Sequence, residues 1–345
     1  MTKDQQSTSI SNQSAQRSAL SAAPRRGPVV HAEFLYNPPE LGLYCHCPSL
    51  VYTTGGDLLA VWYAYPEQEC VEGSLVLARR LAGESRWIRG RKLFDHLKSS
   101  AGNPVLLEEP GGAIRLLFVL LKGKYWNDAE LQSSVSHDGG VTWTMPAALL
   151  PDRGLMARHP PVALADGSLL LPAYNEVSRQ SMLLKSAPPH EEWERSYLFK
   201  PSGLIQPALV RLGPKQLAIF FRPSSDPRLT WRSHSRDDGA TWSPPMQTSL
   251  PNPLSGLSAF TTKNRVTLVY NHTEKHQRYP LSLSHSSDEG ITWEGPWHIE
   301  VLPIEVSYPS FLADDKGSVH GVYTYNRRMI KYVSYKTERN GELLW

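Results

Sequence analysis

The chain has 345 residues, of which 40% are hydrophobic and 20% charged, and its formal net charge is +3. This charge is too small and too dispersed for a nucleic-acid groove, and no stretch approaches the roughly 18–20 apolar residues that a membrane helix needs. With 28 prolines and 24 glycines, the composition suits an all-β protein with many turns.

The first 28 residues are rich in Ser, Gln, Thr and Ala and lack the apolar run of a secretory signal. We therefore expect a disordered tail over residues 1–28 and one folded domain over residues 29–345. Three cysteines without a signal peptide indicate a reducing compartment, so we expect a cytoplasmic protein. Cys45-His46-Cys47 suggests zinc, but strand alternation would place His46 opposite the two cysteines, and we expect no metal and no cofactor.

Three segments share the pattern S-x-D-x-G-x-T-W, at residues 136–143, 235–242 and 286–293. This pattern is typical of a tight hairpin turn, in which the Asp side chain accepts hydrogen bonds from turn amides and Gly supplies a positive φ. The Trp is expected to start the next strand and to pack between neighbouring sheets.

The tryptophans extend the repeat through the chain. Six tryptophans follow one another at similar intervals, namely Trp87, Trp143, Trp193, Trp242, Trp293 and Trp345. Consecutive members of this series are 56, 50, 49, 51 and 52 residues apart. Six periods of about fifty residues predict a six-bladed β-propeller of four-stranded antiparallel blades.

Two strands are predicted in each repeat. The first opens with proline or its equivalent, where no ladder donor is lost, at residues 48–51, 104–107, 161–164, 207–210, 257–260 and 309–312. The second follows a short turn, at residues 58–63, 114–120, 168–172, 216–221, 265–270 and 319–325. No helical periodicity of useful length appears.

Polar residues gather at two points of each repeat. In a propeller the first strand lies nearest the axis, so its start and the end of the second strand fall on one face. Before the first strands lie His46, Asn103, Arg158, His159, Gln206, Asn252, Glu305 and Tyr308. After the second strands lie Glu67 with Glu69, Lys122, Asn175 with Glu176, Arg222, Asn271 with Arg278, and Tyr325 with Arg327. This set predicts a central pocket for a polyhydroxylated, anionic small molecule, since arginine forks favour carboxylates.

With these motifs the chain resembles the sialidase superfamily, specifically the BNR-repeat, sialidase-like group, over about residues 40–335. The aspartate-box turns carry the resemblance, together with the segments 205–207, 251–253, 278–281 and 307–309. Sialidases hold the substrate carboxylate with three arginines. They use a tyrosine paired with a glutamate as nucleophile and an aspartate as acid/base.

The resemblance implies that Tyr308 is the nucleophile and that Arg222 and Arg278 are the second and third arginines. His46 stands where the first arginine is expected, and Gln206 stands where the glutamate is expected. The family's acid/base aspartate is expected after the second strand of the first repeat, but the only acidic residues there are glutamates, namely Glu67, Glu69 and Glu72.

Glutamine cannot take the proton of a tyrosine, so two substitutes are open. Glu176 or Glu305 could reach Tyr308 as a base. Alternatively, His46 or His159 could act as acid/base with Tyr308 as its partner. A His/Tyr pair beside an arginine-bound carboxylate could also perform lyase chemistry on a uronic acid.

The leading hypothesis is an exo-acting, sialidase-like glycoside hydrolase for a small acidic sugar or glycoconjugate. Arg222, Arg278 and Arg158 would bind the substrate, Tyr308 would be nucleophile or proton-transfer residue, and the acid/base candidates are His46 and Glu69. A lyase or isomerase and a non-catalytic propeller that binds a glycan or a protein are the alternatives. Each residue also has a structural alternative, as a core aromatic, an ion pair between blades or a strand-end cap.

Overall fold

The computed structural model describes residues 25–26, 29, 31–262 and 265–337. The predicted tail and Trp345 lie outside these ranges, except for β1 (Arg25–Arg26), which pairs in parallel with β23 (Glu294–Glu300). The described helices are two short 3-10 turns, Pro39–Leu41 and Trp126–Asp128. None of the described helices is long and apolar enough to cross a membrane. The chain is therefore all-β, as predicted.

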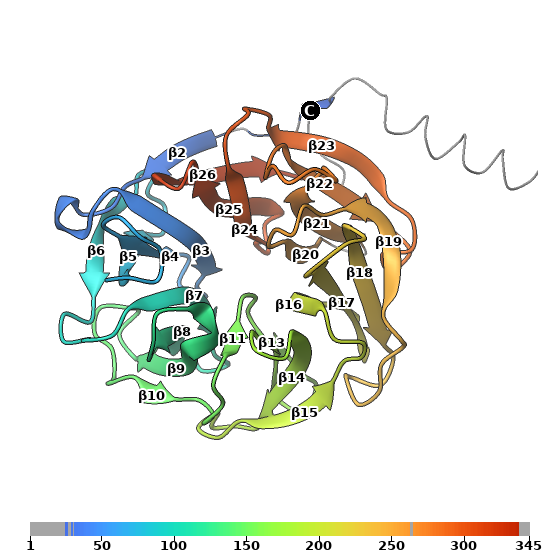
Figure 1. Ribbon diagram of the computed structural model, residues 1–345, viewed down its shortest axis with the longest axis horizontal. Helices are drawn as coiled ribbons and strands as arrows, with labels where there is room; N and C mark the ends of the chain where they lie inside the picture. The colour runs from blue at the N-terminus through green and yellow to red at the C-terminus, as the bar shows by residue number, and fades with distance from the viewer. Residues whose placement is uncertain (1–24, 27–28, 30, 263–264, 338–345) are drawn as a thin grey trace, which may run out of the picture.

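Antiparallel sheets are arranged around a common centre (Figure 1). The first two sheets follow the chain, with strands β3 (Tyr44–Tyr52), β4 (Leu58–Tyr65), β5 (Ser74–Arg80), β6 (Ile88–Leu93) and then β7 (Ala101–Glu108), β8 (Ile114–Leu121), β9 (Ala129–Ser136), β10 (Ala147–Ala148). Two more sheets end the chain, with strands β20 (Ser258–Thr262), β21 (Arg265–Asn271), β22 (Leu281–Ser286), β23 and then β24 (Val306–Ala313), β25 (Ser318–Tyr325), β26 (Met329–Lys336), β2 (His31–Leu35).

Between these pairs lies a nine-stranded sheet. Its strands are β11 (Leu155–Ala157), β12 (Val162–Ala163), β13 (Leu169–Asn175), β14 (Gln180–Ser186), β15 (Glu194–Leu198), β16 (Leu204–Gly213), β17 (Gln216–Pro223), β18 (Leu229–Ser235) and β19 (Met246–Pro251). A single parallel pair, Gln180 with Leu204, joins its two antiparallel halves. Each half thus resembles one of the four-stranded sheets.

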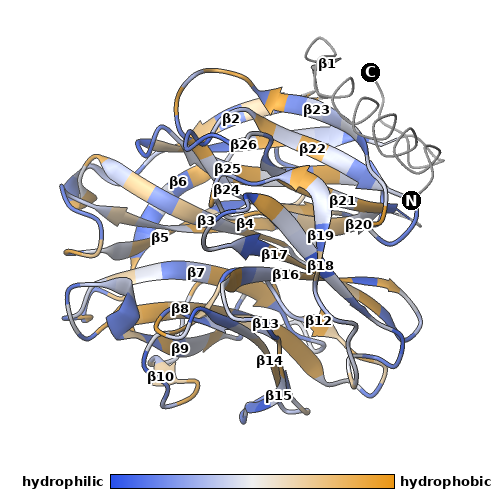
Figure 2. Cartoon of the chain, turned by 45° about the vertical axis from the view of Figure 1, so that its right-hand side comes forward, coloured by the Kyte–Doolittle hydropathy of each residue, from blue (hydrophilic) through white to orange (hydrophobic). Residues whose placement is uncertain are grey.

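The N-terminal strand completes the last sheet. β2 pairs antiparallel with β26, from His31 opposite Ser334 to Leu35 opposite Ile330. The strands carry many hydrophobic residues, coloured orange in Figure 2, and apolar side chains pack between neighbouring sheets. In one such cluster Trp62 of β4 packs with Val322 and Tyr332 of the last sheet. Strand pairing and burial together therefore join the two ends of the chain.

The second strand of each repeat forms where the sequence predicts it, but the first strand starts earlier than predicted in four of the six repeats, while β12 and β20 start one residue later. β3 begins at Tyr44 rather than Pro48, and β24 begins at Val306 rather than Pro309. These prolines sit inside the strands at β-bulges, where the pairing register shifts between His46 and Ser49 and between Ser307 and Ser310. A bulge leaves one residue unpaired, so proline costs no ladder hydrogen bond there.

The aspartate boxes are turns, as predicted. Oδ1 of Asp138 accepts hydrogen bonds from the backbone amides of Val141 and Thr142, at 3.0 and 2.8 Å. Gly140 adopts a φ of 90°, and a Cβ there would lie 2.7 Å from Leu59 in the neighbouring sheet. The same Asp-to-Thr contacts recur at residues 237 and 288, so each box both turns the chain and packs closely.

Candidate functional site

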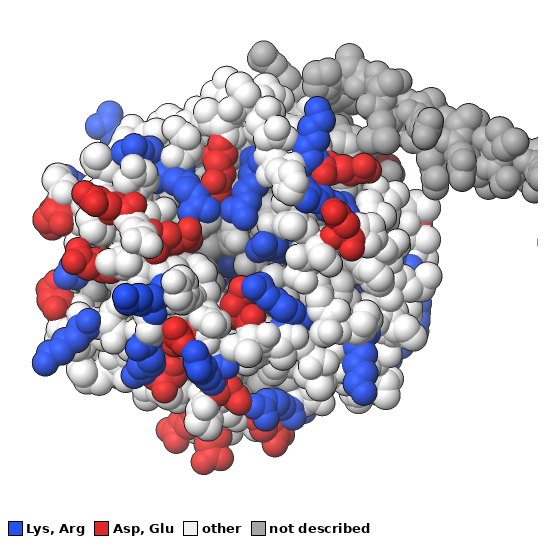
Figure 3. Space-filling model, viewed as in Figure 1, with Lys and Arg blue, Asp and Glu red and all other residues white. Residues whose placement is uncertain are grey.

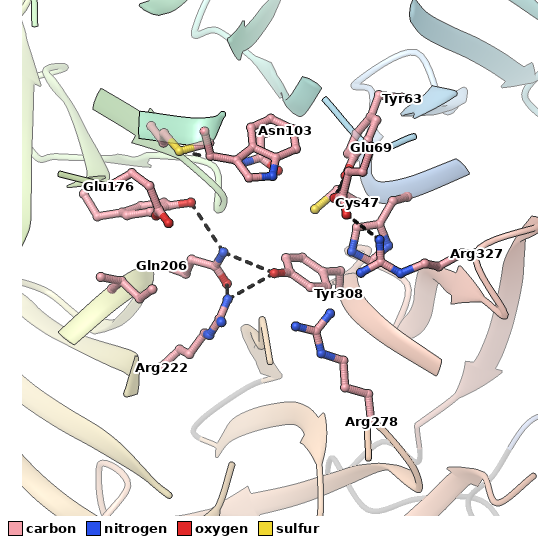
Figure 4. A pocket seen from close by; sticks show the side chains of 15 residues that line it. Cys47, Tyr63, Glu69, Asn103, Glu176, Gln206, Arg222, Arg278, Tyr308 and Arg327 are labelled. Atoms are coloured by element: carbon pink, nitrogen blue, oxygen red, sulfur yellow. Dashed lines mark hydrogen bonds and ion pairs between the residues drawn. The ribbon is translucent and has the colours of Figure 1, made fainter. Parts of the chain in front are cut away.

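A cavity of about 210 Å³ opens at the centre of one face, where the inner strands of several sheets meet. Charged side chains surround this hollow in Figure 3, and Figure 4 shows its walls. Eight of the predicted site residues line it: His46, Glu69, Asn103, Glu176, Gln206, Arg222, Arg278 and Tyr308. The remaining lining residues are Cys47, Tyr63, Trp126, Met156, Tyr174, Ile205 and Arg327.

One backbone device brings four of these side chains to the cavity. Each stands directly before a proline in a bulged inner strand and adopts a left-handed φ: 54° at Cys47, 45° at Asn103, 48° at Gln206 and 52° at Tyr308. Such a φ is uncommon outside glycine, and bulges are known to redirect side chains near active sites. Because the bulge recurs in four inner strands, it indicates that the backbone at these positions is shaped to direct the side chains into the cavity rather than to continue regular strand pairing.

The bulge also overturns the expected alternation at Cys45-His46-Cys47. His46 and Cys47 both line the cavity, while Cys45 packs in the hydrophobic cluster with Trp62. Burial raises the pKa of the Cys47 thiol to about 12. In the described ranges no group of three or more His, Cys, Asp or Glu residues could hold a metal ion.

Tyr308 lies at the centre of the site. Its phenolic oxygen is 3.0 Å from Nη1 of Arg222, which donates a hydrogen bond, and 3.4 Å from Nε2 of Gln206. Gln206 also accepts from Arg222 at 2.9 Å and donates to the hydroxyl of Tyr174 at 3.4 Å. Among the described residues, no carboxylate hydrogen-bonds Tyr308, so its immediate partners are a guanidinium and an amide.

Two further arginines contact the ring of Tyr308. The guanidinium carbons of Arg278 and Arg158 lie 5.3 and 5.5 Å from the ring centroid, within cation–π range. Arg158 is buried and donates to the backbone oxygens of Pro48 and Tyr308, at 3.0 and 2.8 Å. Arg158 therefore lies beneath the cavity and ties two inner strands together, whereas Arg278 lines the cavity itself.

His46 packs against Tyr308, with ring centroids 4.4 Å apart. Burial lowers the pKa of His46 well below its usual value, and the positive charges of four arginines, Arg327 first among them, lower it further. The ring is therefore neutral at pH 7. Its Nδ1 is buried without a hydrogen-bond partner in the described part of the chain, which leaves one polar atom unsatisfied at the cavity wall.

A chain of ion pairs runs along one side of the cavity. Nη1 of Arg327 donates to Glu69 at 2.6 Å, and its Nε donates to Glu305 at 2.8 Å. Glu305 also accepts from Arg278 at 3.1 Å. Glu69 receives a further hydrogen bond from the hydroxyl of Tyr63. Both glutamates are thus held as partners of arginines, and the neighbouring cations help to lower the pKa of Glu305.

The opposite side of the cavity carries Glu176 and Asn103. Glu176 accepts a hydrogen bond from Arg179 at 2.6 Å, and burial raises its pKa. Asn103 is buried and contacts the sulfur of Met156 at 4.0 Å. Neither residue hydrogen-bonds Tyr308.

Besides Arg158 and Glu305, three further predicted residues lie outside the cavity lining. His159 is bonded through Nε2 to the backbone oxygen of Ala259 at 2.9 Å. Asn252 closes a turn, because its side chain bonds both the amide and the carbonyl of Ser255. Tyr325 packs against Phe34, with ring centroids 5.1 Å apart. Each contact is one that a structural role would produce.

Sequence reasoning did not single out several lining residues. Cys47 stands before Pro48 as Gln206 stands before Pro207, so the X-Pro pattern of the inner strands could have found it. Trp126 has no such signal, because it reaches the cavity from the short turn between β8 and β9.

Antiparallel sheets ranged around a central cavity, with aspartate boxes at their turns, place the protein among sialidase-like β-propellers. More specifically, a family model described as a BNR repeat-like domain matches residues 56–321, so the chain belongs to that family. At the level of sequence, none of the curated proteins matches the chain.

Solved structures share the fold at low identity. A Hadza microbial sialidase is 18% identical with a TM-score of 0.74; the match covers 86% of this chain and 66% of that one, just under two thirds of its length. A protein of unknown function from Dyadobacter fermentans is 16% identical with a TM-score of 0.74, over 89% of this chain and 98% of that one. The intramolecular trans-sialidase from Ruminococcus gnavus, solved with oseltamivir carboxylate, is 13% identical with a TM-score of 0.72, over 92% and 99%.

Proposed function

We propose that the protein is a sialidase-like glycoside hydrolase whose central cavity binds a carboxylate-bearing sugar. The observation that carries the proposal is that Arg222 and Arg278 flank Tyr308 in a single cavity. Guanidinium groups favour carboxylates, and the cavity of about 210 Å³ lies beside both of these arginines.

The fold supports the same assignment. We interpret the nine-stranded sheet as two adjacent blades joined by one parallel pair, which makes the ring six-bladed. Its similarity to the Hadza sialidase and to the Ruminococcus gnavus trans-sialidase supports an acidic sugar as the ligand, since the latter was solved with oseltamivir carboxylate.

In this proposal Tyr308 loses its proton as its oxygen attacks the anomeric carbon, and the leaving oxygen gains a proton as its bond to that carbon breaks, so that the alcohol departs. Water then cleaves the bond between Tyr308 and the sugar, which releases the sugar and restores the tyrosine hydroxyl. Arg222 places a positive charge beside the attacking oxygen. A donor at that position stabilises negative charge as it develops. The proton of Tyr308 has no carboxylate acceptor among the described contacts, so this activation differs from that of a tyrosine paired with a glutamate.

The proposal is tested with aryl glycosides of N-acetylneuraminic acid and of glucuronic acid. Release of the aryl alcohol by the unaltered protein, and its loss in Tyr308→Phe, would support hydrolysis. Asp315→Asn, at an exposed residue outside the cavity lining, provides the control and should keep the activity. No release from either glycoside at any pH would overturn the proposal.

A second candidate function rests on His46. Its Nδ1 has no hydrogen-bond partner among the described residues, and its ring contacts Tyr308, so His46 supplies a neutral base beside an arginine-lined cavity, whereas Gln206 supplies none. This arrangement favours a lyase or isomerase acting beside the carboxylate of a uronic acid. An unsaturated, ultraviolet-absorbing product that disappears in His46→Gln would identify it.

A further inference from the structure

Arg327 lies in the turn between β25 and β26, and backbone bonds fix that turn. Arg327 and Asn326 both adopt a φ of 51°. The amide of Asn326 donates to the carbonyl of Glu305 at 2.7 Å, and the amide of Cys45 donates to the carbonyl of Arg327 at 2.9 Å. The start of the side chain is therefore tied to β3 on one side and to the segment before β24 on the other.

Two carboxylates fix the guanidinium as well. Glu69 accepts from Nη1 at 2.6 Å and Glu305 accepts from Nε at 2.8 Å. Within the described ranges, Nη2 of Arg327 has no protein partner, although Arg327 lines the cavity. Since a guanidinium has five N–H donors in a fixed fork, orienting it through two edges leaves the third with unused donors.

Glu305 holds two arginines at once. Its Oε1 accepts from Arg278 at 3.1 Å while its Oε2 accepts from Arg327. The shared carboxylate keeps two like-charged guanidiniums at one wall of the cavity, and Figure 4 shows them with Arg222 around Tyr308. Glu69, the last carboxylate in this series of ion pairs, also accepts a hydrogen bond from the hydroxyl of Tyr63.

The charges of these groups leave room for one anion. Three arginines, Arg222, Arg278 and Arg327, face two carboxylates, Glu69 and Glu305, so the five side chains sum to +1. Glu176, which lines the cavity together with Glu69, is paired with Arg179. The buried guanidinium of Arg158 beneath the ring of Tyr308 adds a further positive charge, so an anionic ligand would offset an excess of positive charge at the cavity.

We propose that Arg327 is a third substrate-binding arginine, which contacts the ligand carboxylate together with Arg222 and Arg278, while Glu69 and Glu305 position it. The inference rests on the proposed function and deepens it. It supplies from the last sheet the guanidinium that His46 does not provide, and it makes Glu69 a positioning residue rather than the acid. The charge of Arg327 also acts on His46 more strongly than that of any other side chain.

The test compares two probes that differ by one charge, oseltamivir carboxylate and its uncharged ethyl ester, by isothermal titration calorimetry. In Arg327→Gln, affinity for the carboxylate should fall about ten- to a hundredfold, the loss expected for a hydrogen bond between charged groups. Affinity for the ester should change less than about twofold. Arg327→Lys should recover only part of the loss, because lysine keeps the charge but not the fork; it also serves if Arg327→Gln does not fold.

The matched control is Arg328→Gln, because Arg328 lies next in the same turn but stacks on Tyr44 at 4.1 Å, outside the cavity lining. It should bind both probes as the unaltered protein does. The double variant Arg327→Gln with Glu69→Gln separates contact from charge compensation. A persistent loss supports direct contact, and full recovery of carboxylate affinity overturns it.

The two proposals fail differently. If Arg222→Gln and Arg278→Gln weaken carboxylate binding while Arg327→Gln does not, the role of Arg327 is refuted and the proposed function stands. If the unaltered protein binds neither probe, or binds both equally, the acidic-sugar site itself is refuted and the role of Arg327 with it.

Discussion

Nη1 of Arg222 lies 3.0 Å from the phenolic oxygen of Tyr308, so a positive charge rather than a carboxylate is the nearest charged partner of this tyrosine. The adjacent place is held by Gln206, which donates to the same oxygen at 3.4 Å. The site therefore contains arginines suited to binding a carboxylate. It has no carboxylate hydrogen-bonded to the hydroxyl of Tyr308 among the described residues, so this hydroxyl lacks an adjacent base.

Replacing Gln206 with a carboxylate should supply the missing base. In Gln206→Glu the new side chain can accept the proton of Tyr308 and keep the contact with Arg222, which now reaches Gln206 at 2.9 Å. General-base assistance contributes about 10²–10⁴ in rate, so hydrolysis of a reactive aryl glycoside should rise by at least about tenfold. Adding Tyr308→Phe should remove the gain. A rate that stays level or falls would show that Gln206 is not the limiting feature.

Gly256 allows Tyr308 its position. A Cβ at residue 256 would lie 3.0 Å from Cδ1 of Tyr308 and 3.2 Å from Oε1 of Gln206, closer than most real contacts. Gly256→Ala should therefore displace the tyrosine, and a displacement of about 1 Å can cost about a hundredfold in rate. Steady-state kinetics should show the loss with little change in melting temperature. Gly111→Ala, which meets nothing within 4 Å, is the control; equal activity in both variants would contradict the prediction.

His46 should stay neutral well below pH 6.5. Burial and the four surrounding arginines lower its pKa in the folded state, so the folded protein binds this proton less readily than the unfolded chain. The stability that the neutral ring contributes is present above about pH 6.5, the usual histidine value, and is lost as the pH falls below it.

Imidazole NMR signals measure this directly. The His46 resonances should not shift between pH 8 and about pH 6, and the exposed His137 provides a reference signal in the same spectra. A bound carboxylate should raise the pKa of His46, because it offsets the arginine charges. A titration midpoint near 6.5 in the free protein would contradict the expected effect of burial.

The aspartate boxes should stabilise the fold in a pH-dependent way. Hydrogen bonds from Thr241 lower the pKa of Asp237 to about 2, against an ordinary value of 3.8. This contribution is present above about pH 3.8 and is lost as the pH falls toward 2. Asp237→Asn should thus lower the melting temperature by a few degrees at pH 7, and the difference should shrink near pH 2. Asp315→Asn, at an exposed residue, is the control; a deficit that persists unchanged at pH 2 would count against the hydrogen-bond explanation.

The sequence alone determined the local structure of this protein. The fifty-residue period, the aspartate boxes and the apolar runs predicted an all-β repeat, because turn geometry and strand burial depend on residues close together in the chain. The same phase also indicated that His46, Gln206, Arg222, Arg278 and Tyr308 belong to one face, and they line one cavity.

Only the tertiary structure decided which of these side chains touch. The bulges turn Cys47 toward the cavity together with His46, which strand alternation could not anticipate. The last sheet brings Arg327 within reach of Glu69, 258 residues away along the chain, and Arg158 is drawn beneath the cavity to hold backbone carbonyls. Such contacts depend on how sheets that are distant in the sequence are arranged around one centre, and local sequence patterns do not determine that arrangement.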